Sequence, residues 1–403
     1  MKVVFDDEAF SYQLLRTLGY APYKGADIGE CLQTAYRIKE GDFESWYQEW
    51  FDTAERIRGI ADASLNSGDN ISARETYLRA SNYYRSAEFF IHGDPADARI
   101  LETSRKSRES FQQAAALCEP PLESVTIAYE TTTLPGYFIK ADTSMAPKPT
   151  LILNTGFDGT AEELYFTGAA AASRGYQCLL FEGPGQGRVI REQSIPFRPD
   201  WEKVITPVVD YLLARKDVMS ARIALYGISL GGYLAPRAAA FEHRLAACIA
   251  NGGVFSLFQV FADNRGLSEE EAERYVTDSP EGLDKSVEEA MKHNSELRWG
   301  VEDGMWKFNA KTPHEYVLKL KAYSMADCAD KVACPTLVID SEKDTKFPGQ
   351  ARKLYEALRS EKEFMLFTVR DAAEEHCQAG ASLLSNQRVF DWLDKTFKKS
   401  KRS

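Results

Sequence analysis

The sequence predicts an α/β protein with a mostly parallel, doubly wound sheet, a preceding helical domain and an inserted helical cap. Three observations support this class. Residues 1–120 show only helical periodicity, apolar strands alternate with helices across residues 121–403, and polar, helical sequence interrupts that alternation at about 254–327. Apolar strands that alternate with helices are typical of parallel sheets covered on both faces. We therefore expect two domains, with the cap inserted in the second.

Two segments of the N-terminal domain, residues 44–57 and 73–90, place aromatic and aliphatic side chains three or four positions apart. This spacing is typical of amphipathic helices. Gly68 and Gly93 mark the turns after them. We interpret the aromatic stripe on these helices as helix packing rather than as a cofactor site. The pair Pro120-Pro121 ends the domain.

From Ser124 onward the hydrophobic period changes from that of helices to that of strands. Residues 125–129 and 136–140 predict a hairpin of half-exposed strands. The remaining apolar runs predict buried strands, and the segments between them predict helices. The strands are expected at 149–154, 176–181, 223–226, 245–250, 335–340 and 364–369, and two of the helices at 201–216 and 385–397.

The central motif is the pentapeptide Gly227-Ile-Ser-Leu-Gly231, which lies between the apolar run 223–226 and a helix-forming segment from Tyr233. A strand, a sharp turn and a helix around Gly-x-Ser-x-Gly form a nucleophile elbow. A side chain at either glycine would collide with the neighbouring strand or helix. We predict that Ser229 is a nucleophile at the tip of this turn. A plain Gly/Ser turn is the alternative, and the rest of the chain decides between them.

A serine nucleophile needs a base and an orienting acid, which follow it along the chain in the order Asp or Glu, then His. Of the five histidines, His376 alone lies in a loop after a late strand, so we predict that it is the base. The acid is expected in the loop after strand 335–340, the strand that follows the cap. We choose Asp344 and keep Glu342 in reserve, because Asp340 still lies at the strand end.

The oxyanion hole of such a site consists of two backbone N–H groups. We predict the amide of Leu230, directly after the nucleophile, and the amide of Phe157, in the glycine-rich loop after strand 149–154. A second glycine-rich segment, Gly183–Gly187, lacks the Gly-Lys-Ser/Thr element of a phosphate loop and is not expected to open a helix. We interpret it as a structural turn near the mouth of the site.

Composition excludes several function classes. The formal net charge of −11 argues against a nucleic-acid partner, which would require clustered Lys and Arg. Acidic residues close to Met1 and the lack of a long apolar run predict neither a secretory signal nor a membrane span, so we expect a cytoplasmic protein. The seven cysteines have no metal-like spacing, and no dinucleotide motif follows a strand. We expect no metal and no organic cofactor.

With these residues in place, the chain resembles an α/β-hydrolase of the branch that contains 2,6-dihydroxypseudooxynicotine hydrolase and fungal pigment-pathway hydrolases that shorten polyketides. Most of the chain shares in the resemblance, including the helical domain. The motifs that carry it are residues 41–47, 77–85, 155–163, 181–187, 227–232, 244–249 and 375–377.

This resemblance implies an α/β-hydrolase fold, hydrolysis of a carbon–carbon bond next to a carbonyl in a small molecule, and a homodimer. It also directs attention to the segment after residue 252, where a relative is thought to use an acidic residue. No glutamate stands at the matching place, and Asp263 is the nearest acid. In the same segment Phe255, Phe258 and Phe261 suggest an apolar pocket, although phenylalanines three apart also fit plain helix packing. The candidate substrate-binding residues are Asp158, Phe255, Phe258 and Asp263.

Three hypotheses follow. The first is a carbon–carbon bond hydrolase that acts on a polyketide or another β-dicarbonyl compound. The second keeps the fold and the triad but makes the protein an esterase, a lactonase, or an intramolecular acyl transferase or cyclase, because a dry pocket favours an internal nucleophile over water. The third is a non-catalytic protein that uses its helical domain for docking. A complete set of Ser, Asp and His in the expected order argues against it.

Overall fold

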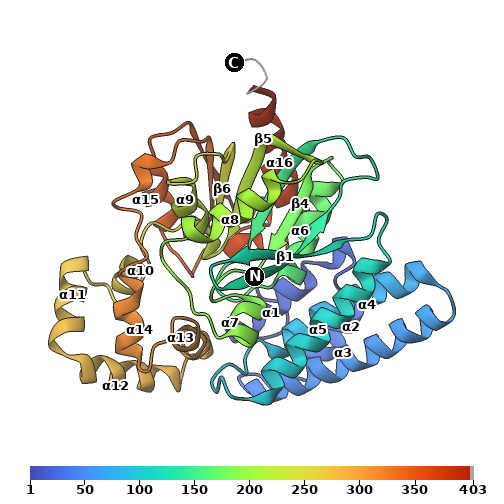
Figure 1. Cartoon of the computed structure of the whole chain (residues 1–403). Coiled ribbons are helices and arrows are strands. Elements are labelled where there is room, and N and C mark those ends of the chain that lie inside the picture. The colour runs from blue at the N-terminus through green and yellow to red at the C-terminus, as the bar shows by residue number, and fades with distance from the viewer. Residues whose placement is uncertain (400–403) are drawn as a thin grey trace.

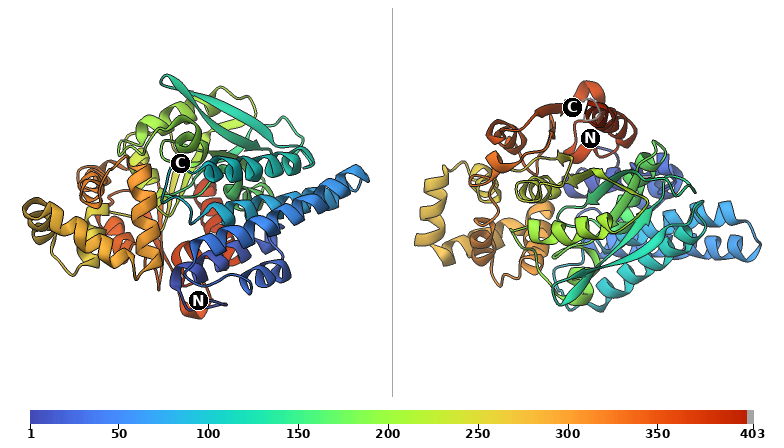
Figure 2. Two further views of the ribbon diagram at one scale, coloured as in Figure 1. Left: turned by 90° about the horizontal axis from the view of Figure 1, so that it is seen from below. Right: turned by 45° about the horizontal axis from the view of Figure 1, so that its top comes forward.

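The computed structural model describes residues 1–399 of the chain. A central sheet, a helical domain and a helical cap are its three parts. In Figure 1 the cap and the helical domain lie on the same lower side of the sheet, the cap at the left and the helical domain at the right. The views in Figure 2 keep these two parts on opposite flanks.

The helical domain begins its helices with aspartates. Asp7, Asp27, Asp42 and Asp97 each accept hydrogen bonds from amides of the first turn, which the helix itself leaves without partners. The aromatic stripe packs in the interior, where Trp46 and other large rings are fully buried. The helices are α1 (Glu8–Leu18), α2 (Ile28–Ala35), α3 (Phe43–Asn66), α4 (Asn70–Glu88) and α5 (Ala98–Ala116), with a short 3₁₀ helix at Ala21–Tyr23.

The sheet of the described chain has the order β1-β2-β4-β3-β5-β6-β7-β8. The first two strands form an antiparallel hairpin whose second strand pairs antiparallel with β4, and all other pairs are parallel. This arrangement confirms the predicted fold class. The strands are β1 (Glu123–Tyr129), β2 (Thr132–Ile139), β3 (Lys148–Asn154), β4 (Gln177–Phe181), β5 (Val218–Ile228), β6 (Ala247–Asn251), β7 (Thr336–Ser341) and β8 (Lys362–Phe367).

Alternate residues of the buried strands face two separate hydrophobic cores. On β3, Ile152 belongs to the core that also contains buried residues of α8 (Glu202–Leu213), α9 (Gly231–Ala239) and α15 (Gln350–Ala357). Its neighbours Leu151 and Leu153 belong to the other core, which contains residues of α6 (Ala161–Ala172), α16 (Ser382–Lys399) and part of the helical domain. Because both faces are covered, the strands carry continuous apolar sequence. The remaining helices of this part are α7 (Gly187–Gln193) and the 3₁₀ turns Ala329–Lys331, Val369–Asp371 and His376–Gln378.

The cap lies between β6 and β7 and has a small core of its own. Phe258, Ala262, Val276, Leu283 and Val287 are buried within it. Its helices are α10 (Leu257–Asn264), α11 (Glu269–Asp278), α12 (Pro280–Met291), α13 (Ser295–Lys307) and α14 (Pro313–Leu320). Across residues 1–399, no helix combines the length and the hydropathy that a membrane crossing requires.

Candidate active site

Ser229 lies in the turn between β5 and α9, where its backbone has a positive φ of 61°. Close packing of this turn requires glycine on both sides. A Cβ atom added to Gly227 would lie 1.9 Å from the carbonyl oxygen of Gly231. A non-glycine residue with positive φ is strained, and such strain is concentrated at functional sites. The turn therefore has the geometry of a nucleophile elbow.

Ser229, His376 and Asp344 are hydrogen bonded in series, although they come from three distant loops. Oγ of Ser229 lies 2.9 Å from Nε2 of His376, and Nδ1 of His376 lies 2.6 Å from Oδ2 of Asp344. The reserve acid Glu342 instead accepts a hydrogen bond from the backbone amide of Val369. Among the acids considered from the sequence, Asp344 is thus the one that contacts the imidazole.

The surroundings of the pair keep Asp344 ionised. Burial alone would raise the pKa of Asp344, but His376 and the backbone amides of Lys346 and Phe347 lower it below its ordinary value. Burial alone would lower the pKa of His376, whereas Asp344 and Cys377 raise it above its ordinary value. An ionised carboxylate on Nδ1 fixes the tautomer in which Nε2 can accept the serine proton.

The loop Thr155–Gly159 lies directly against the elbow. A Cβ atom on Gly156 would approach the backbone nitrogen of Leu230 to 2.7 Å and the side chain of Ser229 to 2.8 Å. The side-chain amide of Gln186 holds this loop, because its Nε2 donates to the carbonyl oxygens of Thr155 and Gly156, at 2.8 and 3.1 Å. The segment Gly183–Gly187 thus supports the site, but α7 begins at Gly187, so the expectation that this segment opens no helix is wrong.

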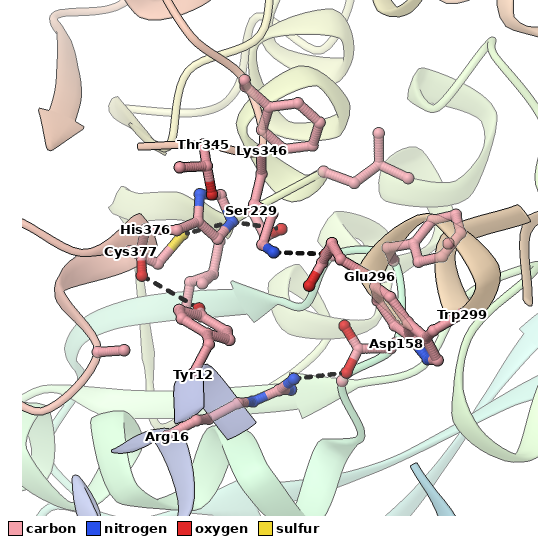
Figure 3. Close-up of a pocket in the computed structure, with 18 of the residues that line it drawn as sticks. Tyr12, Arg16, Asp158, Ser229, Glu296, Trp299, Thr345, Lys346, His376 and Cys377 are labelled. Atoms are coloured by element: carbon pink, nitrogen blue, oxygen red, sulfur yellow. Dashed lines mark hydrogen bonds and ion pairs between the residues drawn. The ribbon is translucent and has the colours of Figure 1, made fainter. Parts of the chain in front are cut away.

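A cavity of about 670 Å³ opens next to Ser229 and His376. Its walls come from all three parts of the molecule, as the labelled residues in Figure 3 illustrate. The helical domain contributes Tyr12 and Arg16, and the loop after β3 contributes Phe157 and Asp158. The cap supplies a mostly apolar wall, which includes Leu257, Val260, Phe261, Val287, Val317 and Leu320.

Three of the four candidate substrate-binding residues do not line the cavity. Asp158 lines the cavity, but Phe255, Phe258 and Asp263 do not. The face of α10 that meets the cavity carries Leu257, Val260 and Phe261, so Phe258 points into the cap core. Asp263 is partly exposed and pairs with Lys353 at 3.0 Å. The predicted roles of Phe255, Phe258 and Asp263 are therefore corrected.

Sequence reasoning missed the contribution of α1. Arg16 donates to Oδ2 of Asp158 at 2.6 Å and forms two hydrogen bonds with the carboxylate of Glu163, at 2.7 and 2.6 Å. Burial opposes the charge of Arg16, but Asp158 and Glu163 raise the pKa of Arg16 well above its ordinary value. These contacts join residues more than 140 positions apart, so no local pattern in the sequence predicts them.

A buried network of charged side chains links the helical domain, the cap and α7. His92 lies 2.8 Å from Asp303 and 3.1 Å from Glu88, and Glu88 pairs with Arg191 at 2.5 Å. Lys307, which has no exposed surface, donates to Asp303 at 2.8 Å. Each charge is neutralised by a partner of opposite sign, as burial requires.

Another ion pair crosses the cavity wall between the cap and the loop that bears Asp344. Lys346, two positions after Asp344, pairs with Glu296 of α13, and Figure 3 shows both side chains beside Ser229 and His376. The ammonium of Lys346 also lies 5.1 Å from the ring of Tyr12. Within residues 1–399, no group of three or more His, Cys, Asp or Glu side chains is arranged to hold a metal ion.

Comparison with known proteins relates this chain to hydrolases. Residues 131–371 match the X-Pro dipeptidyl-peptidase (S15 family). The hydrolase LUC6 from a Fusarium species is 34% identical over 420 residues, and the match spans 98% of both chains. The 20-hydroxy-prefusarin hydrolase FUS2 from Gibberella moniliformis is 35% identical over 421 residues, again across 98% of both.

A solved structure has the same fold over nearly the whole chain. The 2,6-dihydroxy-pseudo-oxynicotine hydrolase superimposes with a TM-score of 0.74 and is 24% identical, over 93% of this chain and 94% of its own. At that identity the likeness concerns the fold. It includes the helical domain and the cap, because both chains are covered almost from end to end.

Proposed function

The chain belongs to the X-Pro dipeptidyl-peptidase (S15) family and, among the α/β-hydrolases, to the group of the fungal hydrolases LUC6 and FUS2, and from this premise we propose its reaction. The proposed activity is hydrolysis of a carbon–carbon bond next to a carbonyl, of retro-Claisen type, in a polyketide or another β-dicarbonyl metabolite. It proceeds through an acyl-serine intermediate on Ser229. The observation that carries the proposal is the hydrogen-bonded series of Ser229, His376 and Asp344 beside an apolar cavity.

In the first half of the reaction, Oγ of Ser229 bonds to the ketone carbon while Nε2 of His376 takes the hydroxyl proton. The backbone amides of Phe157 and Leu230 stabilise the resulting oxyanion. The carbonyl re-forms as the carbon–carbon bond breaks. The leaving carbanion, stabilised as an enolate by its own carbonyl, receives the proton from the imidazolium of His376.

In the second half, a water molecule gives a proton to His376 and attacks the acyl carbon. Collapse of this second tetrahedral intermediate breaks the bond to Oγ, and the proton returns from His376 to Ser229. The products are a carboxylic acid and a shortened ketone, so one water molecule is consumed for each bond broken. Asp344 stays ionised throughout and stabilises the imidazolium.

The size and lining of the cavity support a small-molecule substrate with an extended apolar part. A volume of about 670 Å³ lies within the range of ligand pockets, and the cap wall is mostly aliphatic and aromatic. Polar side chains also line the cavity, among them Tyr12 and Arg16 of α1 and Asp158 of the loop after β3. A substrate with a β-dicarbonyl head near these polar side chains and an apolar chain under the cap would match both parts of the cavity lining.

The second candidate is an esterase, a lactonase or an acyl-transferring cyclase with the same triad. The apolar cap wall favours this alternative only if it keeps water from the acyl-enzyme, because an internal nucleophile would then resolve the intermediate. The two candidates differ in their products. Carbon–carbon hydrolysis shortens the substrate, whereas cyclisation keeps its full carbon count.

The test is intact-protein mass spectrometry after brief exposure to β-diketone polyketides and to simple esters, with the released products identified in parallel. The proposal expects an acyl adduct on the wild type, none on Ser229→Ala, and a shortened ketone. Adducts from esters alone, or products with every carbon retained, would instead support the second candidate.

A homodimer and a cytoplasmic location also remain proposals. Both come from the sequence and from its resemblance to the 2,6-dihydroxypseudooxynicotine hydrolase branch. Analytical ultracentrifugation over a range of concentrations tests the first, and fluorescence microscopy of the tagged full chain in a fungal host tests the second.

A further inference from the structure

The first helix of the chain reaches the catalytic histidine. The hydroxyl of Tyr12 donates a hydrogen bond to the backbone carbonyl oxygen of His376 at 3.1 Å. The two rings are also neighbours, with centroids 6.4 Å apart. Tyr12 lines the cavity, so the contact lies within the site rather than behind it, as Figure 3 shows.

The segment that Tyr12 contacts has an unfavourable backbone conformation. Cys377 and Gln378, which follow the histidine directly, have φ values of 51° and 55°, a region that non-glycine residues rarely adopt. Such a conformation persists only where surrounding contacts maintain it. The side chain of Gln378 is held by Asn251 and Ser341, at 3.0 Å in each case.

The carbonyl of His376 itself has few partners. Besides the Tyr12 hydroxyl, it accepts a long hydrogen bond of 3.3 Å from the amide of Ala379. Among the described residues, loss of the Tyr12 hydroxyl would leave only that longer contact on the carbonyl oxygen of His376. Rotation of this peptide would move Nε2 away from Oγ of Ser229, which is now 2.9 Å distant.

We propose that Tyr12 is a positioning residue for His376, so that the helical domain completes the active site of the hydrolase domain. The inference rests on the proposed roles of Ser229 and His376. Tyr12 acts through the histidine and takes no proton from the substrate. Burial raises the pKa of Tyr12 well above its ordinary value, so the phenol remains a donor at neutral pH.

The experiment measures how fast a fluorophosphonate labels Ser229, because this reaction needs the base but no natural substrate. Tyr12→Phe removes one oxygen atom and keeps the ring. We expect labelling to slow about 10- to 100-fold, since small misplacements of catalytic groups have effects of this size. Tyr23→Phe is the matched control, because Tyr23 joins the same two domains through Asn386 at 3.0 Å and does not line the cavity.

Two readouts separate positioning from simple packing. First, 4-aminophenylalanine at position 12 restores a donor and should recover most of the labelling rate. Second, the downfield proton resonance of the Nδ1–H of His376 should shift or broaden in Tyr12→Phe and stay unchanged in Tyr23→Phe. Unfolding curves of each variant establish that it is folded.

Equal labelling rates for Tyr12→Phe and the wild type would overturn the proposal. A rate that stays low with 4-aminophenylalanine would also overturn it, because packing would then be the cause. If Tyr12→Phe does not fold, the labelling rates of Tyr12→Gln and Tyr12→Leu are compared instead. Glutamine has a hydrogen-bond donor and leucine has none, so Tyr12→Gln should label faster. If the wild type does not label at all, the assignment of Ser229 as the nucleophile is wrong. The proton resonance of the Nδ1–H of His376 then tests the role of Tyr12 independently.

Discussion

Lys307, at the end of cap helix α13, donates a 2.9 Å hydrogen bond to the carbonyl oxygen of Phe157. The cap therefore contacts the backbone of the loop that we assign to the oxyanion hole. Burial lowers the pKa of Lys307 below its ordinary value, although Asp303 at 2.8 Å opposes that effect. The charge of Lys307 is thus held in place by two partners, one from the cap and one from the loop.

Lys307→Met should weaken both stability and activity. It leaves the carboxylate of Asp303 buried with one partner fewer, which costs about 3–5 kcal/mol when a buried pair is broken. Urea unfolding measures the stability, and kcat for an activated ester measures the effect on the loop. Lys319→Met is the control, because Lys319 is an exposed lysine of the cap that donates to the carbonyl oxygens of Phe308 and Asn309 and has no carboxylate partner among these contacts. Equal losses in both variants would contradict a special role for Lys307.

Asp344→Asn and Glu342→Gln distinguish the two acids that the sequence offers. Asp344→Asn should lower kcat by about 10⁴-fold, because a neutral amide no longer selects the correct imidazole tautomer. Glu342→Gln should leave kcat within about twofold, since the carboxylate of Glu342 contacts the amide of Val369 and not the imidazole. Steady-state kinetics with one ester substrate suffices. A large loss of kcat in Glu342→Gln would instead indicate that Glu342 is the acid that orients His376.

The pH dependence should show a base with a raised pKa. Asp344 and Cys377 outweigh burial and raise the pKa of His376, and Asp340 and Tyr12 also lie near this pair. Only the neutral imidazole accepts the serine proton, so kcat/KM should fall as the pH drops through this pKa. We expect the midpoint above about 6.5, the ordinary value of histidine. A midpoint at or below that value would contradict this electrostatic description of the site.

Phe261→Ala and Phe258→Ala test which face of α10 meets the substrate. Phe261 lines the cavity, so its loss should raise KM for substrates with long apolar chains and spare short esters. Phe258 lies in the cap core, so Phe258→Ala should cost about 3–5 kcal/mol of stability. A KM series over chain length, together with thermal unfolding, separates the two effects. A chain-length effect from Phe258→Ala alone would reverse the assignment of the faces.

Local sequence predicts that Ser229, His376 and Asp344 meet, and the structure places these three side chains in hydrogen-bond contact. The elbow at Ser229 is a short motif with its own strand and helix, and His376 and Asp344 follow from chain order and from their positions after late strands. The sheet itself is predictable because buried parallel strands carry continuous apolar runs. These features depend on neighbours in the sequence or on the general architecture.

Residues that depend on contacts between domains were not predictable. Tyr12 and Arg16 meet the site through contacts with His376 and Glu163, and nothing in α1 distinguishes them from ordinary helix residues. The sequence also did not show which side of α10 meets the cavity. Its apolar residues serve both the cap core and the cavity, and periodicity alone does not tell which face is which.

The walls of the cavity have a consequence for how such an enzyme can be divided. The side chains of Ser229, Asp344 and His376 belong to the sheet domain, yet α1 and the cap helices α10, α12, α13 and α14 supply much of the cavity wall. A fragment that starts near residue 121 would retain Ser229, Asp344 and His376 but lose the part of the cavity wall that α1 supplies. The cavity is therefore not a property of the sheet domain alone, and transplanting that domain into another protein would carry over these three side chains without the complete pocket.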